Sequence, residues 1–396
     1  MPEVAYLFER FPSFGQTFCY REVAELERQG AKVHVYSIRR PSDEPAQDWD
    51  EALVKRVHYL PEEKELVREV DRALRDEKVS ASARSAIEEW GRRSDFLRLY
   101  QAIYIGLRLR DAGLHHLHAH FAGMAARTAF WINRFFDIRY SFTAHANDIF
   151  APRDFEISLA KLMDSAAAIV TVSDYAAGYL RNRFPESAAK THRIYNGIDL
   201  SRFPTAASNR EIPAIVSIGR LIEKKGFTDL ISACGILKSR GHRFVCKIIG
   251  EGPLQGALQS QIDKESLQSC VQLAGPQTQS QIVARLADAT LFVLPCVREE
   301  GGGMDNLPTV IMEAMAAGLP IISTPLAGIP EMVEEERSGK LIPEHDPAAI
   351  CAAMEYFIND RSLAQKFGEH GREIALEKFS IEGSVRLLRK LFENSN

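Results

Sequence analysis

The part of this sequence that most constrains its fold is the stretch at residues 305–320, DNLPTVIMEAMAAGLP. It predicts a loop followed by a short buried helix, because apolar residues recur at helical spacing after Pro308. Proline suits the first position of a helix, where its missing N–H costs nothing. Gly318 is typical of a helix C-cap, and Pro320 prevents the helix from continuing.

Two carboxylates flank this predicted helix start. Asp305 precedes the helix, and Glu313 follows eight positions later on its second turn. The N-terminal end of a helix favours anions, so acidic side chains there compete with anionic ligands. Taken alone, the pair has an ordinary interpretation as an N-cap and a solvated glutamate. The pattern around the two acids favours a functional one.

The whole stretch resembles the signature of glycosyltransferase family 4, the retaining transferases with the GT-B fold. Glu313 begins EAMAAGLP, which fits the family's E-A-M-A-x-G-x-P, and Asp305 stands where the family usually has Glu. The resemblance implies that Glu313 binds the ribose of a nucleotide-sugar donor and that Asp305 binds the donor sugar. The next residues are close to the Gly-Leu-Pro of members that build bacterial exopolysaccharides, and the implied donor-binding residues are Asn306, Leu307, Pro308 and Thr309.

The composition is that of an ordinary soluble globular protein. Its 396 residues predict two or three domains, with 45% hydrophobic and 26% charged residues. A formal net charge of −4 argues against nucleic acid as a partner. Six scattered cysteines without a C-x-x-C pair are typical of reduced thiols. With neither a signal segment nor an apolar run long enough for a membrane span, the expected location is cytoplasmic.

The N-terminal part alternates strands and helices like a doubly wound α/β domain. Residues 4–8 and 32–38 are predicted strands, with an amphipathic helix at 17–29 between them. Ligands bind such domains beyond the C-terminal ends of the strands, which makes the loop after the first strand a candidate site. It resembles the F-P-x-x-S-E-T-F loop of exopolysaccharide transferases, with Gly15 and Gln16 as the implied donor contacts. Gly15 either lets the backbone approach a ligand or only forms a turn.

Residues 62–113 form a charge-rich segment with helical patterning and few breakers. Most of its charges are expected to lie on a solvated face. In the family such an insertion lies near the acceptor. A peripheral contact with the inner face of the plasma membrane is therefore one interpretation of this segment.

Two other patterns suggest metal binding but have better interpretations. Residues 48–50 form a D-x-D, yet their loop lacks the context of a metal–nucleotide site, and chance explains the match better. His116, His118 and His120 alternate with apolar residues along a predicted strand. Imidazoles on one strand face rarely close a metal site without further ligands. Structural and substrate-lining roles are favoured, and no metal or cofactor is expected.

A polar cluster follows the predicted strand at residues 139–144. His145 lies at the end of this strand, where an imidazole is suited to hydrogen bonding a sugar; a buried core histidine is the alternative. Residues 143–148, TAHAND, resemble the T-A-H-x-x-D of the same transferases. The resemblance implies that His145 contacts the donor sugar from the N-terminal domain.

The α/β alternation restarts at residues 214–220. Arg220 and Lys225 follow the first strand of this half, where an arginine fork and a compact lysine charge suit a diphosphate. An exposed basic loop is the alternative. The segment GRLIEKKG resembles the family's G-R-L-x-x-x-K-G diphosphate clamp. It implies that Gly219, Arg220 and Lys225 hold the donor diphosphate.

Three further loops belong to the same predicted edge. Glu251 lies in a G-E-G-P turn, which is a weak dinucleotide fingerprint and better resembles the G-x-G-P turn of the family. Pro276 ends the next strand, where the family reads the nucleobase, and both residues are implied donor contacts. The glycines at 301–303 imply a mobile rim over the sugar.

These features predict a GT-B fold, with two facing Rossmann-like doubly wound domains and the active site in the cleft between them. The predicted N-terminal, acceptor-side domain comprises residues 1–196, and the nucleotide-sugar-binding domain comprises 197–379. The boundary follows from residues 196–199, NGID, which resemble the family's interdomain crossing. A last helix at about 380–396 is expected to pack back on the first domain.

The resemblance implies retaining transfer of a sugar from a nucleotide-sugar, with UDP favoured over GDP, to a hydroxyl of a glycan or lipid-linked acceptor. The setting would be exopolysaccharide or cell-envelope glycan synthesis. The implied catalytic residues are His145, Arg220, Lys225 and Asp305. A nucleotide-sugar 2-epimerase of the same architecture and a non-catalytic nucleotide-sugar-binding protein remain alternatives. NMR of the product distinguishes the epimerase, and binding without turnover distinguishes the binding protein.

Overall fold

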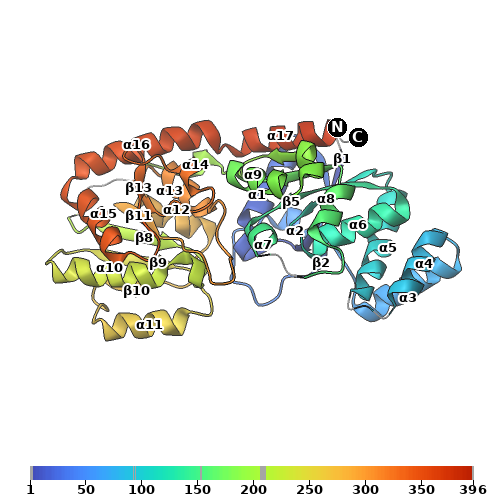
Figure 1. The fold of residues 1–396 in the computed structure, drawn as a ribbon, viewed down its shortest axis with the longest axis horizontal. Helices are drawn as coiled ribbons and strands as arrows, with labels where there is room; N and C mark the ends of the chain where they lie inside the picture. The colour runs from blue at the N-terminus through green and yellow to red at the C-terminus, as the bar shows by residue number, and fades with distance from the viewer. Residues whose placement is uncertain (1–2, 92, 94, 152–153, 206–210, 395–396) are drawn as a thin grey trace.

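A computed structural model describes residues 3–91, 93, 95–151, 154–205 and 211–394. The described chain builds two parallel β-sheets, each flanked by helices, which lie side by side along the long axis of the molecule (Figure 1). The first sheet has seven strands in the order β3-β2-β1-β4-β5-β6-β7, and the second has six in the order β10-β9-β8-β11-β12-β13. In both orders the chain reverses direction beside the first strand of the sheet, which is the switch point where doubly wound folds bind ligands.

Helices cover both faces of the N-terminal sheet. Its strands are β1 (Glu3–Arg10), β2 (Lys32–Arg39), β3 (His58–Tyr59), β4 (His116–His120), β5 (Arg139–Ala144), β6 (Ala168–Thr171) and β7 (Thr191–Arg193). The helices of this half are α1 (Thr17–Arg28), α2 (Glu51–Lys55), α3 (Glu63–Arg75), α4 (Ala81–Trp90), α5 (Phe96–Asp111), α6 (Met124–Phe136), α7 (Ala146–Phe150), α8 (Leu159–Ser165) and α9 (Asp174–Arg183). Short 3₁₀ helices are η1 (Phe14–Gln16), η2 (Pro185–Lys190) and η3 (Leu200–Arg202).

The C-terminal sheet repeats the arrangement. Its strands are β8 (Ala214–Ile218), β9 (Val245–Ile249), β10 (Val271–Leu273), β11 (Leu291–Leu294), β12 (Ile321–Ser323) and β13 (Gly339–Leu341). Around it lie η4 (Glu223–Lys225), α10 (Phe227–Ser239), α11 (Gln255–Lys264), α12 (Gln279–Ala287), α13 (Thr309–Ala316), α14 (Ile329–Met332), α15 (Pro347–Asn359) and α16 (Arg361–Lys378). The last helix is α17 (Ile381–Asn394).

Strand β1 shows why these sequences form buried strands. Ala5 and Leu7 belong to one hydrophobic core, and Tyr6 and Phe8 belong to another on the opposite face. Alternate side chains of a strand point to opposite faces, so a strand covered by helices on both sides must be apolar throughout. The first face is covered by α5 and α6, whereas the second packs against α1 and α17.

The charge-rich segment at residues 62–113 forms α3, α4 and α5, as its pattern predicts, although residues 92 and 94 lie outside the described residues. Most of its charged side chains are exposed, as expected. Arg98 of α5 is the exception among the described residues: it is buried, and its guanidinium donates to Asp95 at 2.7 Å. Because α5 packs on α6, only α3 and α4 project from the domain (Figure 1).

One helix start differs from the sequence prediction. Helix α13 begins at Thr309, and Pro308 is its N-cap with extended backbone, not its first helical residue. The shift is of one residue, because the position of the cap depends on where the chain leaves the preceding loop. Helix α9 begins at Asp174 and is capped by Ser173, whose Oγ accepts from Ala176 N at 3.0 Å.

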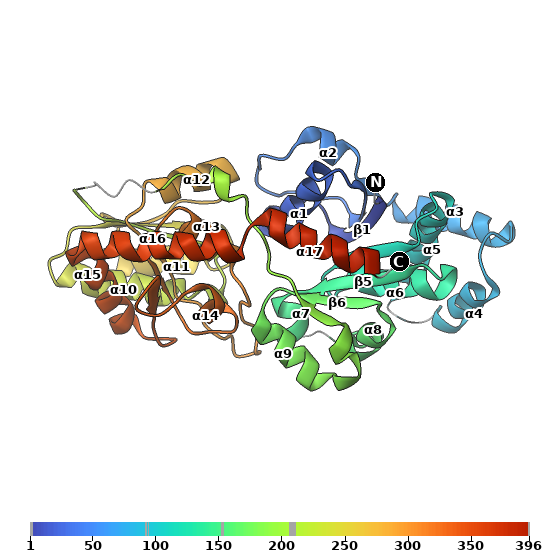
Figure 2. The ribbon, with the colours of Figure 1, turned by 90° about the horizontal axis from the view of Figure 1, so that it is seen from above.

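The chain crosses between the sheets twice, at residues 196–199 and at the α16–α17 junction. Ile198 and Ser380 form a parallel β-bridge between the two crossings. A Cβ on Gly197 would lie 2.3 Å from Ile381 Cα, so only glycine allows this close approach. Beyond the crossing, α17 runs back over the N-terminal half, where Val385 and Leu388 join the core of β1 (Figure 2). Residues 395–396 lie outside the described residues.

Candidate active site

The loops after β8 and β11 bring two predicted site residues into contact. Lys225, on η4, donates to the carboxylate of Asp305, and Lys224 Nζ lies 3.5 Å from the same carboxylate. Asp305 lies in the loop before α13, with 13% of its side chain exposed. Burial alone would raise the pKa of Asp305, but the two ammonium groups outweigh burial and lower the pKa. The predicted diphosphate cation and the predicted sugar-binding acid thus form one ion pair.

Lys224 is a site residue that the sequence analysis passed over. Its side chain is 9% exposed, and its ammonium donates to Asn147 Oδ1 at 2.8 Å. Asn147 lies on α7, so this hydrogen bond joins the two halves of the molecule directly beside Asp305. The available signal was its position directly before Lys225, the predicted diphosphate contact.

Arg220 lies at the same sheet edge but is not paired with Asp305. Its side chain is exposed, whereas Gly219 is packed so that an added Cβ would lie 3.2 Å from the Lys225 side chain. Glu251 is also exposed, and its carbonyl accepts from Leu221 N at 2.8 Å. This hydrogen bond ties the G-E-G-P turn to the loop after β8. Pro276 follows β10 on the same edge and is exposed.

Glu313 is held by a residue that the sequence analysis did not identify. Its carboxylate, 3% exposed, accepts from Arg21 of α1, which also donates to Gln279 Oε1 at 2.7 Å. The predicted ribose-binding acid is therefore in an ion pair with the opposite half of the molecule. Arg21 is four residues into α1, and nothing in its local pattern distinguishes it from a solvated helix arginine.

The residues between the two acids are anchored separately. Asn306 is buried, and its Oδ1 accepts from Ser173 Oγ at 2.5 Å, while its Nδ2 has no partner among the described residues. Leu307 and Pro308 are buried, and Thr309 is half-buried. Ser173 also caps α9, so this hydrogen bond fixes the loop before α13 to the N-terminal half.

His145 lies at the N-terminal end of α7. Its backbone N–H donates to Asp148 Oδ2 at 3.0 Å, and its Nε2 lies 3.3 Å from His120 Nδ1. The ring packs against Phe121 with the centroids 4.4 Å apart. Burial, followed by the charge of His120, lowers the pKa of His145 well below its usual value. A neutral imidazole at this position can donate or accept one hydrogen bond without a charge.

A buried polar network lies behind His145. His120 Nε2 contacts Glu22 Oε1 at 3.0 Å, and the Tyr6 hydroxyl donates to the same oxygen at 2.7 Å. Burial disfavours the His120 imidazolium, but Cys19 and Glu22 outweigh burial and raise its pKa to about 10. The network therefore holds a buried His–Glu ion pair directly beside the predicted sugar-binding histidine.

The same network contains the one group of residues, among those described, whose ligand atoms are spaced for a metal: Glu22, His118 and His120. Both nitrogens of His118 already lie within hydrogen-bond distance of hydroxyls, Ser141 Oγ at 2.8 Å and Thr143 Oγ1 at 2.9 Å. A cation there would have to displace these hydrogen bonds. The geometry thus fits the favoured structural role of the histidines, and the expected absence of a metal stays a prediction.

The first loop places Gly15 and Gln16 in η1, at the C-terminal end of β1. A Cβ on Gly15 would meet nothing within 4 Å, and its backbone is not in the left-handed region. Neither crowding nor conformation therefore requires glycine in this structure, and ligand approach stays a prediction. Gln16 is the N-cap of α1 without a side-chain capping hydrogen bond.

The D-x-D at residues 48–50 consists of two separate helix caps. Asp48 Oδ2 accepts from Ser280 N at 2.9 Å on α12, and Asp50 Oδ1 accepts from Ala52 N at 2.7 Å on α2. The loop that carries Asp48 thus reaches across to the C-terminal half. These caps account for both carboxylates without a metal.

Comparison with known proteins defines the class. The family model described as Glycosyltransferase Family 4 matches residues 15–202, and the model described as Glycosyl transferases group 1 matches residues 202–374. Anabaena HepE, solved in complex with UDP and glucose, has the same fold, with a TM-score of 0.74, 16% identity and coverage of 98% of this chain and 99% of that chain. The fold is that of the GT-B glycosyltransferases, so the predicted fold class is confirmed. The chain belongs to glycosyltransferase family 4.

The relatives narrow the family further. The chain is 33% identical over 234 residues to WcaL of Salmonella typhimurium, a protein named for colanic acid biosynthesis, covering 57% of this chain and 56% of that protein. It is 43% identical over 140 residues to the amylovoran biosynthesis glycosyltransferase AmsK of Erwinia amylovora, covering 35% of this chain and 34% of AmsK. The matches thus span about half or less of these relatives. The predicted resemblance to the exopolysaccharide subgroup is confirmed.

Proposed function

We propose that this protein is a retaining glycosyltransferase that moves a sugar from a nucleotide-sugar to a hydroxyl of a glycan or lipid-linked acceptor in exopolysaccharide synthesis. The supporting observation is that the predicted groups lie along α13 at the junction of the two halves: Lys225 pairs with Asp305 just before the helix, and Glu313 within the helix pairs with Arg21 of the N-terminal half. A lysine, two carboxylates and a helix N-terminus are together suited to a nucleoside diphosphate attached to a polyol.

Each part of the donor would contact a different group of the site. Arg220 and Lys225 neutralise the diphosphate, assisted by the N-terminal end of α13. Glu313 accepts hydrogen bonds from the ribose, and Asp305 accepts them from the sugar. Binding requires two exchanges, because Glu313 is engaged by Arg21 and Asp305 by Lys225 in this structure. Each exchange replaces a protein ion pair with contacts to the donor.

In the chemical step the bond between the anomeric carbon and the diphosphate oxygen breaks, and a bond to the acceptor oxygen forms on the same face. The acceptor proton passes to the leaving phosphate oxygen. Little covalent chemistry is left for the protein, so catalysis consists of positioning and charge stabilisation. Lys225 and Arg220 stabilise the departing diphosphate, and neutral His145 donates or accepts one hydrogen bond at the sugar.

UDP is the nucleotide that we favour, in keeping with the UDP held by HepE. No divalent ion is needed in this proposal, because cationic side chains serve the diphosphate. Activity that EDTA abolishes and Mg²⁺ or Mn²⁺ restores would contradict this part. No helix among the described residues is long and apolar enough to cross a membrane. Attachment to the inner membrane face through α3 and α4 remains part of the proposal and can be tested by vesicle sedimentation.

The experiment that tests the function is a transfer assay with UDP- and GDP-sugars and lipid extracts as the acceptor source. We expect one donor to yield a glycosylated lipid whose anomeric coupling in NMR matches that of the donor. An inverted product would contradict the retaining mechanism. Donor binding without turnover, under any acceptor condition, would contradict an enzymatic function altogether.

A further inference from the structure

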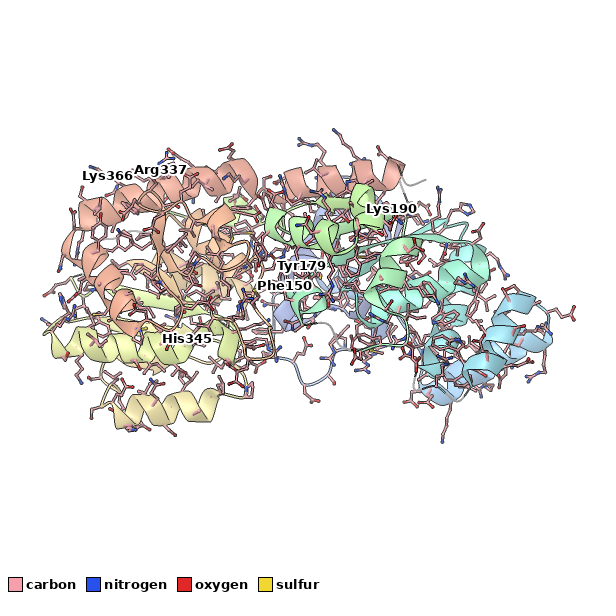
Figure 3. All side chains as sticks on the ribbon, in the orientation of Figure 1. Phe150, Tyr179, Lys190, Arg337, His345 and Lys366 are labelled. Atoms are coloured by element: carbon pink, nitrogen blue, oxygen red, sulfur yellow. The ribbon has the colours of Figure 1, made fainter. Side chains whose placement is uncertain are left out.

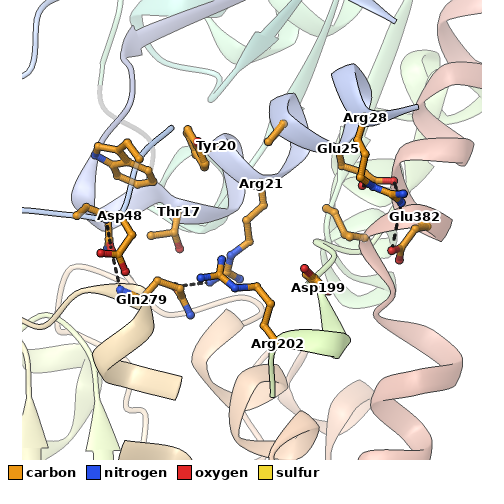
Figure 4. Close-up of a pocket in the computed structure, with 14 residues that line it drawn as sticks. Thr17, Tyr20, Arg21, Glu25, Arg28, Asp48, Asp199, Arg202, Gln279 and Glu382 are labelled. Atoms are coloured by element: carbon orange, nitrogen blue, oxygen red, sulfur yellow. Dashed lines mark hydrogen bonds and ion pairs between the residues drawn. The ribbon is translucent and has the colours of Figure 1, made fainter. Parts of the chain in front are cut away.

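A pocket lies at the junction of the two halves, and Arg21 is one of the residues that line it (Figure 4). Side chains from α1, the loop at 47–49, η3, the start of α12 and the start of α17 line it, and it encloses about 200 Å³. That volume accommodates one monosaccharide-sized group. None of the predicted donor-binding residues lines this pocket.

Two of the residues that line this pocket carry a buried hydrogen-bond donor without an acceptor among the described residues. Gln279 is 7% exposed, and its Nε2 has no partner. Arg21 Nη1 is also buried and unpartnered, although Nη2 of the same guanidinium contacts Glu313 and Gln279. A buried donor without an acceptor costs about 1–3 kcal/mol, so Gln279 and Arg21 call for an acceptor. Arg202, which is exposed, approaches from η3, and the Arg21 and Arg202 side chains point toward one another (Figure 4).

The acids that line the pocket do not supply that acceptor, because each has donors of its own. Asp48 accepts from Ser280 N, and Asp199 accepts from Ser201 N at 3.1 Å. Glu25 accepts from Arg28 at 2.8 Å, and Glu382 accepts from Ser380 Oγ at 2.6 Å. The charge of Arg202 contributes, after hydrogen bonds from Ser280, to the lowered pKa of Asp48, but the Arg202 guanidinium has no hydrogen bond or ion pair with another described residue. Two guanidinium groups that point at each other repel unless an anion lies between them.

One wall of the pocket is aromatic. The Tyr20 and Trp49 rings both line it, with their centroids 4.5 Å apart, and the Tyr20 hydroxyl is occupied as the acceptor of Asp50 N at 2.7 Å. The apolar faces of these rings therefore remain for contact with a ligand. An aromatic face beside a cationic cluster is suited to a ring that carries both C–H groups and an acidic substituent.

We propose that this pocket binds an acidic sugar, a pyranose that carries a carboxylate. The carboxylate lies between Arg21 Nη1 and Arg202 and accepts from Gln279 Nε2, while the sugar ring packs against Trp49 and Tyr20. Planar guanidinium groups match carboxylate geometry, which gives the pocket its preference for an acid over a neutral sugar. Because Arg21 contacts both this pocket and Glu313, the occupant lies next to the proposed nucleotide site. Its assignment as a unit of the acceptor glycan rests on the proposed function.

The test measures equilibrium binding of glucuronate, glucose and inorganic phosphate to the full-length protein, by NMR line broadening or calorimetry. We expect glucuronate to bind at least about tenfold more tightly than glucose, since hydrogen bonds to a charged group contribute about 1.5–3 kcal/mol. Arg202→Ala should lose about tenfold or more of the glucuronate affinity. Arg202 is exposed, so the variant should fold, and a thermal unfolding curve checks that it does.

The matched control is Arg337→Ala, which removes an exposed arginine on the outer surface of the C-terminal half (Figure 3) and should leave binding unchanged. Trp49→Ala should weaken glucuronate but not acetate, which has no ring. Equal affinity for glucuronate and glucose, an unchanged Arg202→Ala variant, or tighter binding of phosphate than of glucuronate would each overturn the proposal. The binding assay contains no nucleotide. Its result therefore tests the acidic-sugar pocket independently of whether the protein proves to be a transferase.

Discussion

Arg21 and Glu313 form a buried ion pair that joins the first helix of the N-terminal half to the signature helix of the C-terminal half. The side chains are 11% and 3% exposed, so the two charges are largely removed from water. Such a pair is costly to break from one side, because the remaining charge is left buried. In this conformation Arg21 therefore occupies the Glu313 carboxylate, and the ribose contact that we propose for Glu313 requires this pair to open.

The first prediction concerns this pair. Arg21→Ala should lower the free energy of unfolding by about 3–5 kcal/mol, the cost of leaving Glu313 buried without its partner. Urea titration measures the loss. Arg28→Ala is the matched control on the same helix. Arg28 is 61% exposed, and the carboxylate of its partner Glu25 also accepts from Gln29 at 2.6 Å, so the variant should change stability little. Equal losses in the two variants would contradict a buried coupling.

The second prediction concerns the diphosphate. Arg220→Ala and Lys225→Ala should each weaken UDP binding by about 1.5–3 kcal/mol, because each removes a charged hydrogen-bond donor. Calorimetry provides the measurement. Lys238→Ala, whose ammonium donates to the Ser266 carbonyl on the surface, is the control and should bind UDP normally. Unchanged UDP and GDP affinities in both Arg220→Ala and Lys225→Ala would contradict the assignment of these residues to the diphosphate.

The third prediction separates the two carboxylates. Glu313→Gln should cost affinity for UDP itself, because Glu313 is expected at the ribose. Asp305→Asn should leave UDP binding nearly intact yet slow transfer, since a charged acceptor for the sugar is lost. Asp305→Glu should also lower activity, because the longer side chain would crowd Lys225 and Cys296. Full turnover in Asp305→Asn would contradict a role in sugar binding and would leave Asp305 only as the ion-pair partner of the two lysines.

The fourth prediction concerns His145. His145→Ala should lower turnover more than nucleotide affinity, because the ring is expected at the sugar and not at the base. Steady-state kinetics and UDP calorimetry separate the two effects. His192→Ala, on the edge strand β7, is the control and should preserve both quantities. Equal losses of turnover and UDP affinity in His145→Ala would identify a purely structural histidine.

The fifth prediction concerns acid stability. Burial, followed by the charge of Arg139, lowers the pKa of His116 to about 4. The unfolded chain therefore binds more protons than the native state between pH 6.5 and 4, so stability falls as the pH falls through this window. The contribution of His116 amounts to at most about 3 kcal/mol. In urea unfolding, His116→Gln should show a shallower decline from pH 6.5 to 4.5, and an identical slope would refute the assignment.

His120 acts in the opposite direction. Its pKa is raised to about 10, so the native state binds more protons than the unfolded chain above pH 6.5. Its stabilising contribution is complete below pH 6.5 and is lost as the pH rises toward 10. His116 and His120, four positions apart on β4, thus change stability in opposite directions with pH, because His116 contacts the Ser141 hydroxyl whereas His120 contacts Glu22.

The sequence by itself determined the fold class and the family. Periodic apolar runs defined the strands and most helices, and the fixed offsets of residues 305–320 identified the signature helix, because these patterns depend only on neighbours along the chain. The exact start of a helix was less well determined: Pro308 is the N-cap of α13 and not its first residue, since a shift of one residue leaves the local pattern almost unchanged.

Only the tertiary structure decided which side chains meet. Arg21 and Glu313 are 292 positions apart, and Lys224 and Asn147 are 77 apart, so no local pattern connects them. The burial of α5 and of the β4 histidines likewise depends on which elements pack over them. Short-range spacing specifies elements and motifs, whereas the charge state and partners of a side chain depend on long-range packing, which brings desolvation and opposing charges together.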